Sequence, residues 1–244
     1  ASGQSQSAMM LTTYVNSVQA TARVYDGFLL HSGFVEPASN NPPVPVFVVF
    51  TMNEGNGKLA EGPNFTKWQV AGATHNDANL MAKGTEVMGD LGNVNIECSK
   101  PVNDFPAWQA YNAAYDWLER WVSSGERPPS GTPFETAPGG GLRLDQHGNA
   151  LGGVRLPDIE VPVATHSLAN APANPFDIVG NLACGLGGSV TRFTEQQLLD
   201  LYSTHERYVQ EYTHAADEAL AAGYLLRADY DAALEAAKKA PIPN

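Results

Sequence analysis

The first 80 residues combine one helical and several strand-like hydrophobic patterns. Apolar residues recur at helical spacing from Met9 to Val18, which predicts an amphipathic helix that begins just after Ser5. Three apolar or alternating segments then predict strands, at Phe28–His31, Pro45–Phe50 and Thr66–Ala71. The continuous run at Pro45–Phe50 is typical of a strand buried on both faces of a parallel sheet. These patterns predict an α/β fold with a mostly parallel sheet and packing helices.

The region after residue 100 is predicted to begin with a helix and to continue as irregular chain. Aromatic and aliphatic residues repeat at three and four positions after Pro106, so a helix is expected to run to about Gly125. Residues 124–190 are rich in Gly, Pro, Asn and Ser, and a segment of this length is expected to be a structured excursion near the site. One strand is expected within it, at Ile159–Thr165.

Two helices are expected at the carboxy-terminal end, within residues 194–239. Thr194 and Gln197 form a capping box, which predicts a long helix from about residue 194 to Gly223. A second helix is expected from Asp229 to Lys239. With 244 residues, of which 43% are hydrophobic, the chain can bury a sizeable core. Residues 1–244 are therefore expected to form one domain, or a large part of one.

Acidic residues outnumber basic residues in the chain. There are 26 Asp and Glu against 14 Lys and Arg, which gives a formal net charge of −12. Nucleic acids and anionic membrane surfaces reward clustered Lys and Arg, so neither is expected as a partner. No stretch of the sequence approaches the ~20 apolar residues that span a bilayer.

Ser5 lies in a run of small residues that leads directly into the first predicted helix. Gly3 and Ser7 stand two residues before and two residues after it. This small-x-Ser-x-small pattern is typical of the tight strand-to-helix turn that exposes a nucleophilic serine. The backbone N–H of Gln6 would then lie at a helix N-terminus and donate to a developing oxyanion. Taken alone, the motif also fits an ordinary serine in a terminal loop.

An acidic residue and a histidine follow two of the predicted strands in an order that fits Ser5. Glu54 comes after one strand, and His75 follows the next through a glycine-led turn. Serine, then acid, then histidine is the chain order of α/β-hydrolases, and chymotrypsin and subtilisin use other orders. Asp77 competes with Glu54 to hold the imidazole, but Glu54 is preferred because it ends the right strand. His31 also ends a predicted strand and is expected to be structural.

Longer segments resemble a bacterial α/β-hydrolase-domain family, largely uncharacterised, whose members run to roughly twice this length. The matching segments are Gly3–Ser7, Trp68–Asp77, Asp145–Pro157 and the helical tail from Phe193 to about Ala240. The resemblance implies an α/β-hydrolase fold with Ser5 as nucleophile, Glu54 as acid and His75 as base. The implied reaction is hydrolysis of a small-molecule carboxylic ester through an acyl-enzyme.

The resemblance also implies that the chain is the carboxy-terminal half of such a domain, beginning at the turn that holds Ser5. The earlier strands and the loop that gives a second oxyanion donor would precede residue 1. The four residues before Ser5 are too few for a strand of typical length. We therefore expect an incomplete domain that needs an N-terminal half of the same domain for activity. A non-catalytic fragment or pseudoenzyme with a binding or structural role is the alternative.

Cys98 and Cys184 lie far apart, each in a segment typical of a loop. No Cys-x-x-Cys spacing is present, so zinc and dithiol redox chemistry are not expected. The resemblance implies an exported protein, and in an oxidising compartment the two cysteines are expected to form one disulfide. Two unrelated buried thiols are the alternative. A periplasmic or secreted location is favoured on the same grounds.

Other residues with chemical potential are expected to be structural. Asp145 with His147, and His214 with Asp217, have spacings that a metal ion uses, but further ligands are not nearby, so no metal or cofactor is expected. Three aromatic residues are expected in the core rather than in a substrate pocket: Trp68, Trp108 and Phe134.

Overall fold

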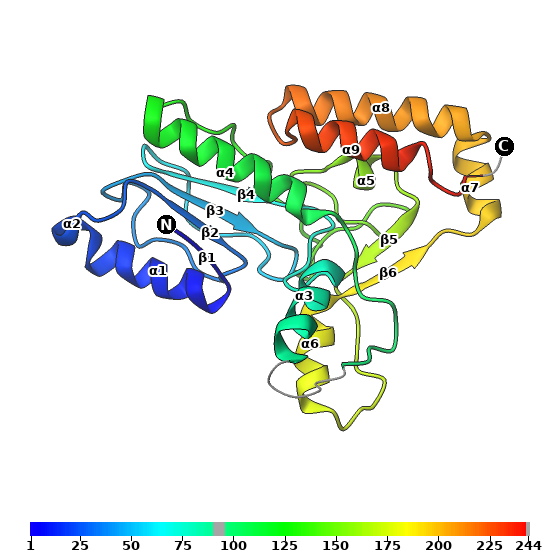
Figure 1. Cartoon of the computed structure of the whole chain (residues 1–244), viewed down its shortest axis with the longest axis horizontal. Coiled ribbons are helices and arrows are strands. Elements are labelled where there is room, and N and C mark those ends of the chain that lie inside the picture. Colours follow the sequence, from blue (N-terminus) through cyan, green and yellow to red (C-terminus); the bar gives the residue numbers. More distant parts are fainter. Residues whose placement is uncertain (90–95, 243–244) are drawn as a thin grey trace.

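A four-stranded parallel sheet forms the centre of the protein (Figure 1). The computed structural model describes residues 1–89 and 96–242. Four strands lie side by side in chain order: β1 Ser2–Gln4, β2 Phe28–His31, β3 Val46–Phe50 and β4 Phe65–Gln69. Every neighbouring pair is parallel, so the carboxyl ends of all four strands meet at one edge. The predicted α/β fold with a mostly parallel sheet is confirmed.

Helices cover both faces of the sheet, which explains why its strands are continuously apolar. α1, Gln6–Ser17, lies on one face and is followed by the short α2, Gln19–Ala22; α4, Ala107–Ser124, lies on the opposite face (Figure 1). Alternate residues of β3 enter two separate clusters of buried side chains. Val46, Val48 and Phe50 pack on the α1 side, whereas Phe47 and Val49 pack on the α4 side. The sheet is therefore the middle layer of three.

Two helices that the hydrophobic pattern did not predict lie beside the edge where the strands end. α3, Ala78–Gly89, follows β4, and α6, Ile178–Gly187, belongs to the excursion (Figure 1). Each is preceded by an aspartate whose Oδ1 accepts a backbone N–H three residues on: Asp77 from Leu80, and Asp177 from Gly180, both at 2.8 Å. An aspartate in this position is an N-cap signal that the sequence did contain.

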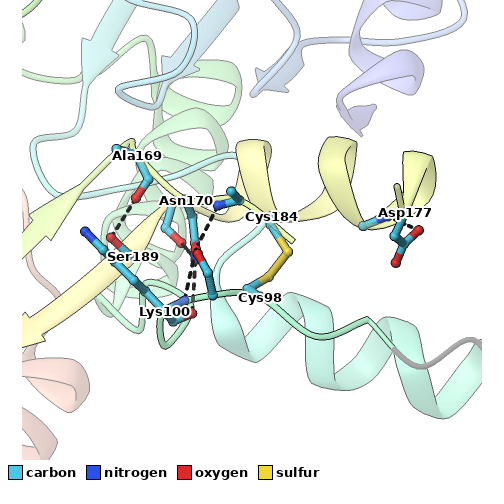
Figure 2. The surroundings of a disulfide bond; sticks show 11 residues. Cys98, Lys100, Ala169, Asn170, Asp177, Cys184 and Ser189 are labelled. Carbon is cyan, nitrogen blue, oxygen red and sulfur yellow. Dashed lines mark hydrogen bonds between the residues drawn. A yellow bond between two sulfur atoms is a disulfide. The ribbon is translucent and has the colours of Figure 1, made fainter. Parts of the chain in front are cut away.

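A disulfide ties α6 to the segment that precedes α4. Cys98 and Cys184 are joined, with their Cα atoms 5.6 Å apart (Figure 2). Nearby, Asn170 Nδ2 donates to the carbonyls of Lys100 at 3.2 Å and Gly188 at 2.6 Å, so the same two segments are also held by hydrogen bonds. Cys184 lies on a helix, and the expected loop at this position is wrong.

A two-stranded antiparallel sheet and a short helix form another part of the excursion. β5, Ala164–Ser167, pairs with β6, Ser189–Arg192, and α5 spans Pro157–Glu160. The strand expected at Ile159–Thr165 is therefore wrong except at its last two residues, which begin β5. Proline at the first helical position and acidic residues in the first turn favour a helix at Pro157–Glu160.

Three helices form the carboxy-terminal region: α7 Glu195–Tyr202, α8 His205–Ala221 and α9 Arg227–Ala237. The capping box of Thr194 and Gln197 begins α7. The single long helix expected from 194 to 223 is wrong, because the backbone of Ser203 has a φ of 64° and Thr204 caps a new helix. No helix within the described residues is long and apolar enough to cross a bilayer.

A strand of three residues, β1, precedes Ser5, and it is shorter than a strand of typical length. Its pairing with the sheet begins at the first residue. The amino group of Ala1 donates to Gly27 O at 2.8 Å, and the N–H of Leu29 donates to Ala1 O at 3.0 Å. These bonds extend the ladder between β1 and β2 beyond the strand itself.

Replacing Cys98 and Cys184 together by serine should lower the free energy of unfolding by about 4 to 5 kcal/mol. The bond joins residues 86 positions apart, and in the chain-entropy model a cross-link of that span restricts the unfolded chain by this amount. Urea denaturation of the two proteins measures the difference. Dithiothreitol should reproduce the loss in the parent and leave the double variant unchanged. Equal sensitivity of both proteins to dithiothreitol would show that the loss has another origin.

Candidate active site

Ser5 lies at a tight turn between β1 and α1. Its backbone has a φ of 56°, a conformation that residues with a side chain rarely adopt, and its N–H donates to His31 O at 3.1 Å. The turn brings α1 back so closely that a Cβ on Gly3 would lie 2.8 Å from the backbone of Ser7. Glycine is therefore required two residues before the serine, as in the turns that present nucleophiles in hydrolases.

The imidazole of His75 lies between Ser5 and Glu54. His75 Nε2 is 2.9 Å from Ser5 Oγ, and His75 Nδ1 is 2.8 Å from Glu54 Oε1. The side chain of His75 is 4% exposed and that of Glu54 is fully buried. Because the carboxylate accepts the Nδ1–H, the lone pair on Nε2 faces the serine hydroxyl. The structure thus brings together the three residues selected from the sequence.

The second carboxylate oxygen of Glu54 is held by Thr51. Glu54 Oε2 accepts the backbone N–H and the hydroxyl of Thr51, both at 2.6 Å. A buried charge is costly unless its oxygens have partners, and hydrogen bonds to a charged group are the stronger kind. Thr51 therefore offsets the cost of burying Glu54 and fixes the direction of its other oxygen toward His75.

Two amide side chains fix the backbone of His75. Asn53 Oδ1 accepts the N–H of His75 at 2.8 Å, and Gln4 Nε2 donates to the His75 carbonyl at 3.3 Å. Gln4 and Asn53 stand immediately before Ser5 and Glu54 in the sequence. Neither was selected from the sequence, although their adjacency to those residues was a usable signal.

The end of α6 is bonded to the turns that carry Glu54 and His75. Three hydrogen bonds make this connection: Asn53 Nδ2 to Gly185 O at 3.5 Å, Asn76 N–H to Leu186 O at 3.2 Å, and Thr74 Oγ1 to Gly187 O at 3.0 Å. The last carbonyls of a helix have no acceptor role within it, so they are available to such donors. The excursion thereby supports the site from outside the sheet.

The backbone N–H of Gln6 comes at the start of α1, directly after Ser5. The first N–H groups of an α-helix have no acceptor within the helix. These N–H groups point outward from the helix N-terminus. The partial positive charge of the helix dipole at that end also attracts a negatively charged group. Gln6 N–H is thus suited to stabilise an oxyanion that forms beside Ser5.

Asp77 lies close by but is directed to another part of the structure. Its Oδ1 accepts the N–H of Leu80 at the start of α3, as described above. Burial raises the pKa of the Asp77 carboxyl, and hydrogen bonds from the backbone of α3 oppose that shift. His75 Nδ1 is bonded to Glu54 Oε1.

His31 ends β2 next to Ser5 and is largely buried. Burial lowers its pKa to about 4, and the neighbouring Glu54 carboxylate opposes the shift. The ring lies against Tyr111, with 4.8 Å between the ring centroids. Within the described residues, His31 Nδ1 has no hydrogen-bond partner. His31 is therefore a neutral imidazole at physiological pH.

A buried amide and a buried imidazole support the turn that carries His75. Asn103 Nδ2 donates to Gly72 O at 2.7 Å and contacts Thr74 Oγ1 at 3.2 Å, while His166 Nδ1 donates to Asn103 Oδ1 at 2.6 Å. Burial lowers the pKa of His166 to about 4, and the nearby Arg192 acts in the same direction. No motif marked Asn103 or His166, because their partners are distant in the sequence.

A cavity of about 750 Å³ opens beside Ser5 and His75. His31 and Gln4 contribute to its polar side, and apolar residues of α3 and α6 form the opposite wall. Two of the three aromatic residues expected in the core do lie in the main core, namely Trp68 and Phe134. The core position expected for Trp108 is wrong, because its side chain is 38% exposed and lines a smaller cavity to which His75 also contributes.

The pairs with metal-like spacing have other partners. Asp145 Oδ1 accepts the N–H of His147 within a turn, and Asp217 Oδ1 accepts the hydroxyl of Tyr230. His214 is exposed and lies 3.5 Å from Glu218 one helical turn on. Within residues 1–89 and 96–242 there is no group of three or more His, Cys, Asp or Glu side chains that could hold a metal ion.

Comparison with known proteins gives a family match over nearly the whole chain. The model of a family described as an alpha/beta hydrolase domain matches residues 1–235. No curated protein and no solved structure matches the chain. The matched region includes Ser5, Glu54 and His75, and it also includes α6.

The free energy of unfolding should fall as the pH is lowered from about 6.5 to about 4. His31 and His166 have a pKa of about 4 in the folded protein against an ordinary value of 6.5. Between these two pH values the unfolded chain binds more protons than the folded protein does, which favours unfolding. Each histidine adds a slope of at most about 1.4 kcal/mol per pH unit in this window, and its stabilisation is fully present above it. Urea denaturation at several pH values measures the slope.

Two variants test whether the slope comes from the buried histidines or from other titrating groups. His166→Gln should reduce the slope, whereas His214→Gln, at an exposed position, should leave it unchanged. NMR titration of the parent follows the imidazoles directly. Titration of both His31 and His166 near pH 6.5 in the folded protein would contradict the explanation.

Proposed function

Since the chain belongs to the α/β-hydrolase domain family, we propose that it is a serine hydrolase that cleaves carboxylic esters through an acyl-enzyme. The observation that carries the proposal is the hydrogen-bonded series from Ser5 Oγ through His75 to Glu54. A serine hydroxyl is a weak nucleophile at neutral pH, and this series is how proteins activate one. The lack of charged residues among the described lining of the cavity supports a neutral ester as substrate.

Acylation begins when Ser5 Oγ attacks the ester carbonyl carbon and His75 Nε2 takes the hydroxyl proton. The carbonyl oxygen gains negative charge, and the Gln6 N–H at the start of α1 donates to it. Glu54 stabilises the imidazolium through Nδ1–H. The tetrahedral intermediate then expels the alkoxide, which receives the proton from His75 Nε2 and leaves as the alcohol.

Deacylation repeats the same steps with water. His75 Nε2 takes a proton from a water molecule as its oxygen attacks the acyl carbon. The bond to Ser5 Oγ breaks, and His75 returns the proton to that oxygen. The products are a carboxylic acid and free Ser5, so the residues named end each cycle in their starting state.

A fluorophosphonate probe should label Ser5 covalently. The phosphorus centre reacts with an activated serine and releases fluoride, so the protein gains the mass of the phosphonyl group. Intact mass spectrometry of the natural gene product, followed by peptide mapping around Ser5, measures this, and Ser5→Ala is the unlabelled control. A folded protein that never labels would favour a non-catalytic binding or structural domain.

Replacing Glu54 by glutamine should lower kcat for 4-nitrophenyl acetate by about 10³ to 10⁴-fold, because the amide no longer holds the imidazole in its working tautomer. Asp77→Asn is the matched control, since Asp77 caps α3, and it should cost less than ~10-fold. Comparable losses from the two substitutions would contradict the assignment of Glu54 as the acid. Thermal denaturation of each variant shows whether a loss of activity comes from unfolding.

A further inference from the structure

The cavity beside Ser5 has an apolar wall that the proposed reaction steps do not use. Six residues form this wall: Leu80, Met81, Ile96, Val179, Ala183 and Leu186. They come from α3, from α6 and its end, and from the segment just before Cys98. Among the described residues that line the cavity there is no Asp, Glu, Lys or Arg.

The apolar wall continues onto an exposed face of α6. Val179 lines the cavity and is 60% exposed, and its neighbours Ile178 and Leu182 are 85% and 67% exposed. Aliphatic surface of this kind gains free energy when a ligand removes it from water. The wall therefore offers favourable contacts to a hydrocarbon group that extends outward from Ser5.

The wall is held at a fixed position relative to Ser5. The disulfide from Cys184 and the hydrogen bonds around Asn170 tie α6 to the segment before α4 (Figure 2). At the same C-terminal end of α6, carbonyls of Gly185 and Gly187 accept hydrogen bonds from the turns that carry Glu54 and His75. A preformed wall does not have to be ordered when a ligand binds, which lowers the cost of binding.

The volume of the cavity suits a large substrate better than a small one. Pockets of roughly 300 to 1,000 Å³ enclose most of a drug-sized ligand, and this one has about 750 Å³. An acetyl group would fill only a small part and would leave most of the wall in contact with water. A hydrocarbon chain would cover it.

We propose that this cavity is the binding site for a long hydrocarbon chain of the ester that Ser5 attacks, so that the protein prefers medium- or long-chain esters to acetates. The proposal rests on the proposed function and adds the substrate class to it. The hydrocarbon chain belongs to either the acyl or the alcohol part of the ester, because both parts extend from the same carbonyl group.

Rates with a series of esters test the preference. From 4-nitrophenyl acetate to the octanoate, kcat/KM should rise at least ~10-fold, with up to ~4-fold per added CH₂, the equivalent of about 0.8 kcal/mol each. Ethyl and octyl acetate make the same comparison on the alcohol side. All esters are used below the concentration at which they form micelles. Hydrolysis of acetates without a chain-length preference on either side would overturn the inference and leave the proposed function standing.

A pair of adjacent substitutions locates the preference on the wall. Val179→Asp places a carboxylate in the cavity, where a bound chain would desolvate it, and should reduce the octanoate to acetate ratio by about 10-fold or more. Ile178→Asp makes the same change one residue away, at a position that does not line the cavity. This variant should leave the octanoate to acetate ratio unchanged. An equal fall in both variants would show that the exposed face of α6, and not the cavity, selects the chain.

A binding measurement does not depend on turnover. Nile red should bind to the Ser5→Ala variant and be displaced by 1-octanol, and the further change Val179→Asp should weaken its binding several-fold more than Ile178→Asp does. Binding that these substitutions do not distinguish would overturn the inference even if no ester were hydrolysed. Selective binding without hydrolysis or labelling would instead sustain the cavity assignment and count against the proposed function.

Discussion

The parallel register of the central sheet is the constraint on which the candidate site depends. Because neighbouring strands run in one direction, Ser5, Glu54 and His75 leave the sheet at the same edge, after β1, β3 and β4. The register pairs Gln4 with His31 and Phe50 with Gln69, so the strands end at nearly the same level. Loops of a few residues are then enough to bring the side chains of three distant positions into contact. An antiparallel arrangement would send some of these loops to the opposite edge.

Hydrogen bonds to the backbone complete what the sheet begins. The turn that carries His75 is held by Asn53, Gln4 and Asn103, and the carboxylate of Glu54 is held by Thr51. Each of these contacts satisfies a polar group that would otherwise be buried without a partner, which is the costly state. Precise positioning and the satisfaction of buried polar groups therefore have the same physical origin here.

The strands and the two helices that cover the sheet could be predicted because their periodicity is local. The three candidate residues could be selected for a similar reason: each has a local mark, namely small neighbours around Ser5, or a position just after a strand for Glu54 and His75. α6 could not be predicted from periodicity, because its apolar residues Ile178, Val179 and Leu182 remain exposed and lie among Gly and Asn. The roles of Thr51, Asn103 and His166 depend on which segments meet in space, and spacing along the chain carries no such information. The break at Ser203 was missed because helical periodicity continues on both sides of it.

The connection of α6 to the turns around Glu54 and His75 also bears on the order of synthesis. Asn53 and Gly185 are 132 residues apart, and Thr74 and Gly187 are 113 apart. A ribosome makes Ser5, Glu54 and His75 within the first third of this chain, yet the carbonyls that support two of their turns are made much later. Contacts of such long sequence separation are entropically costly and form late in folding. A nascent chain therefore contains Ser5, Glu54 and His75 well before it contains the α6 carbonyls that bond to the turns beside Glu54 and His75.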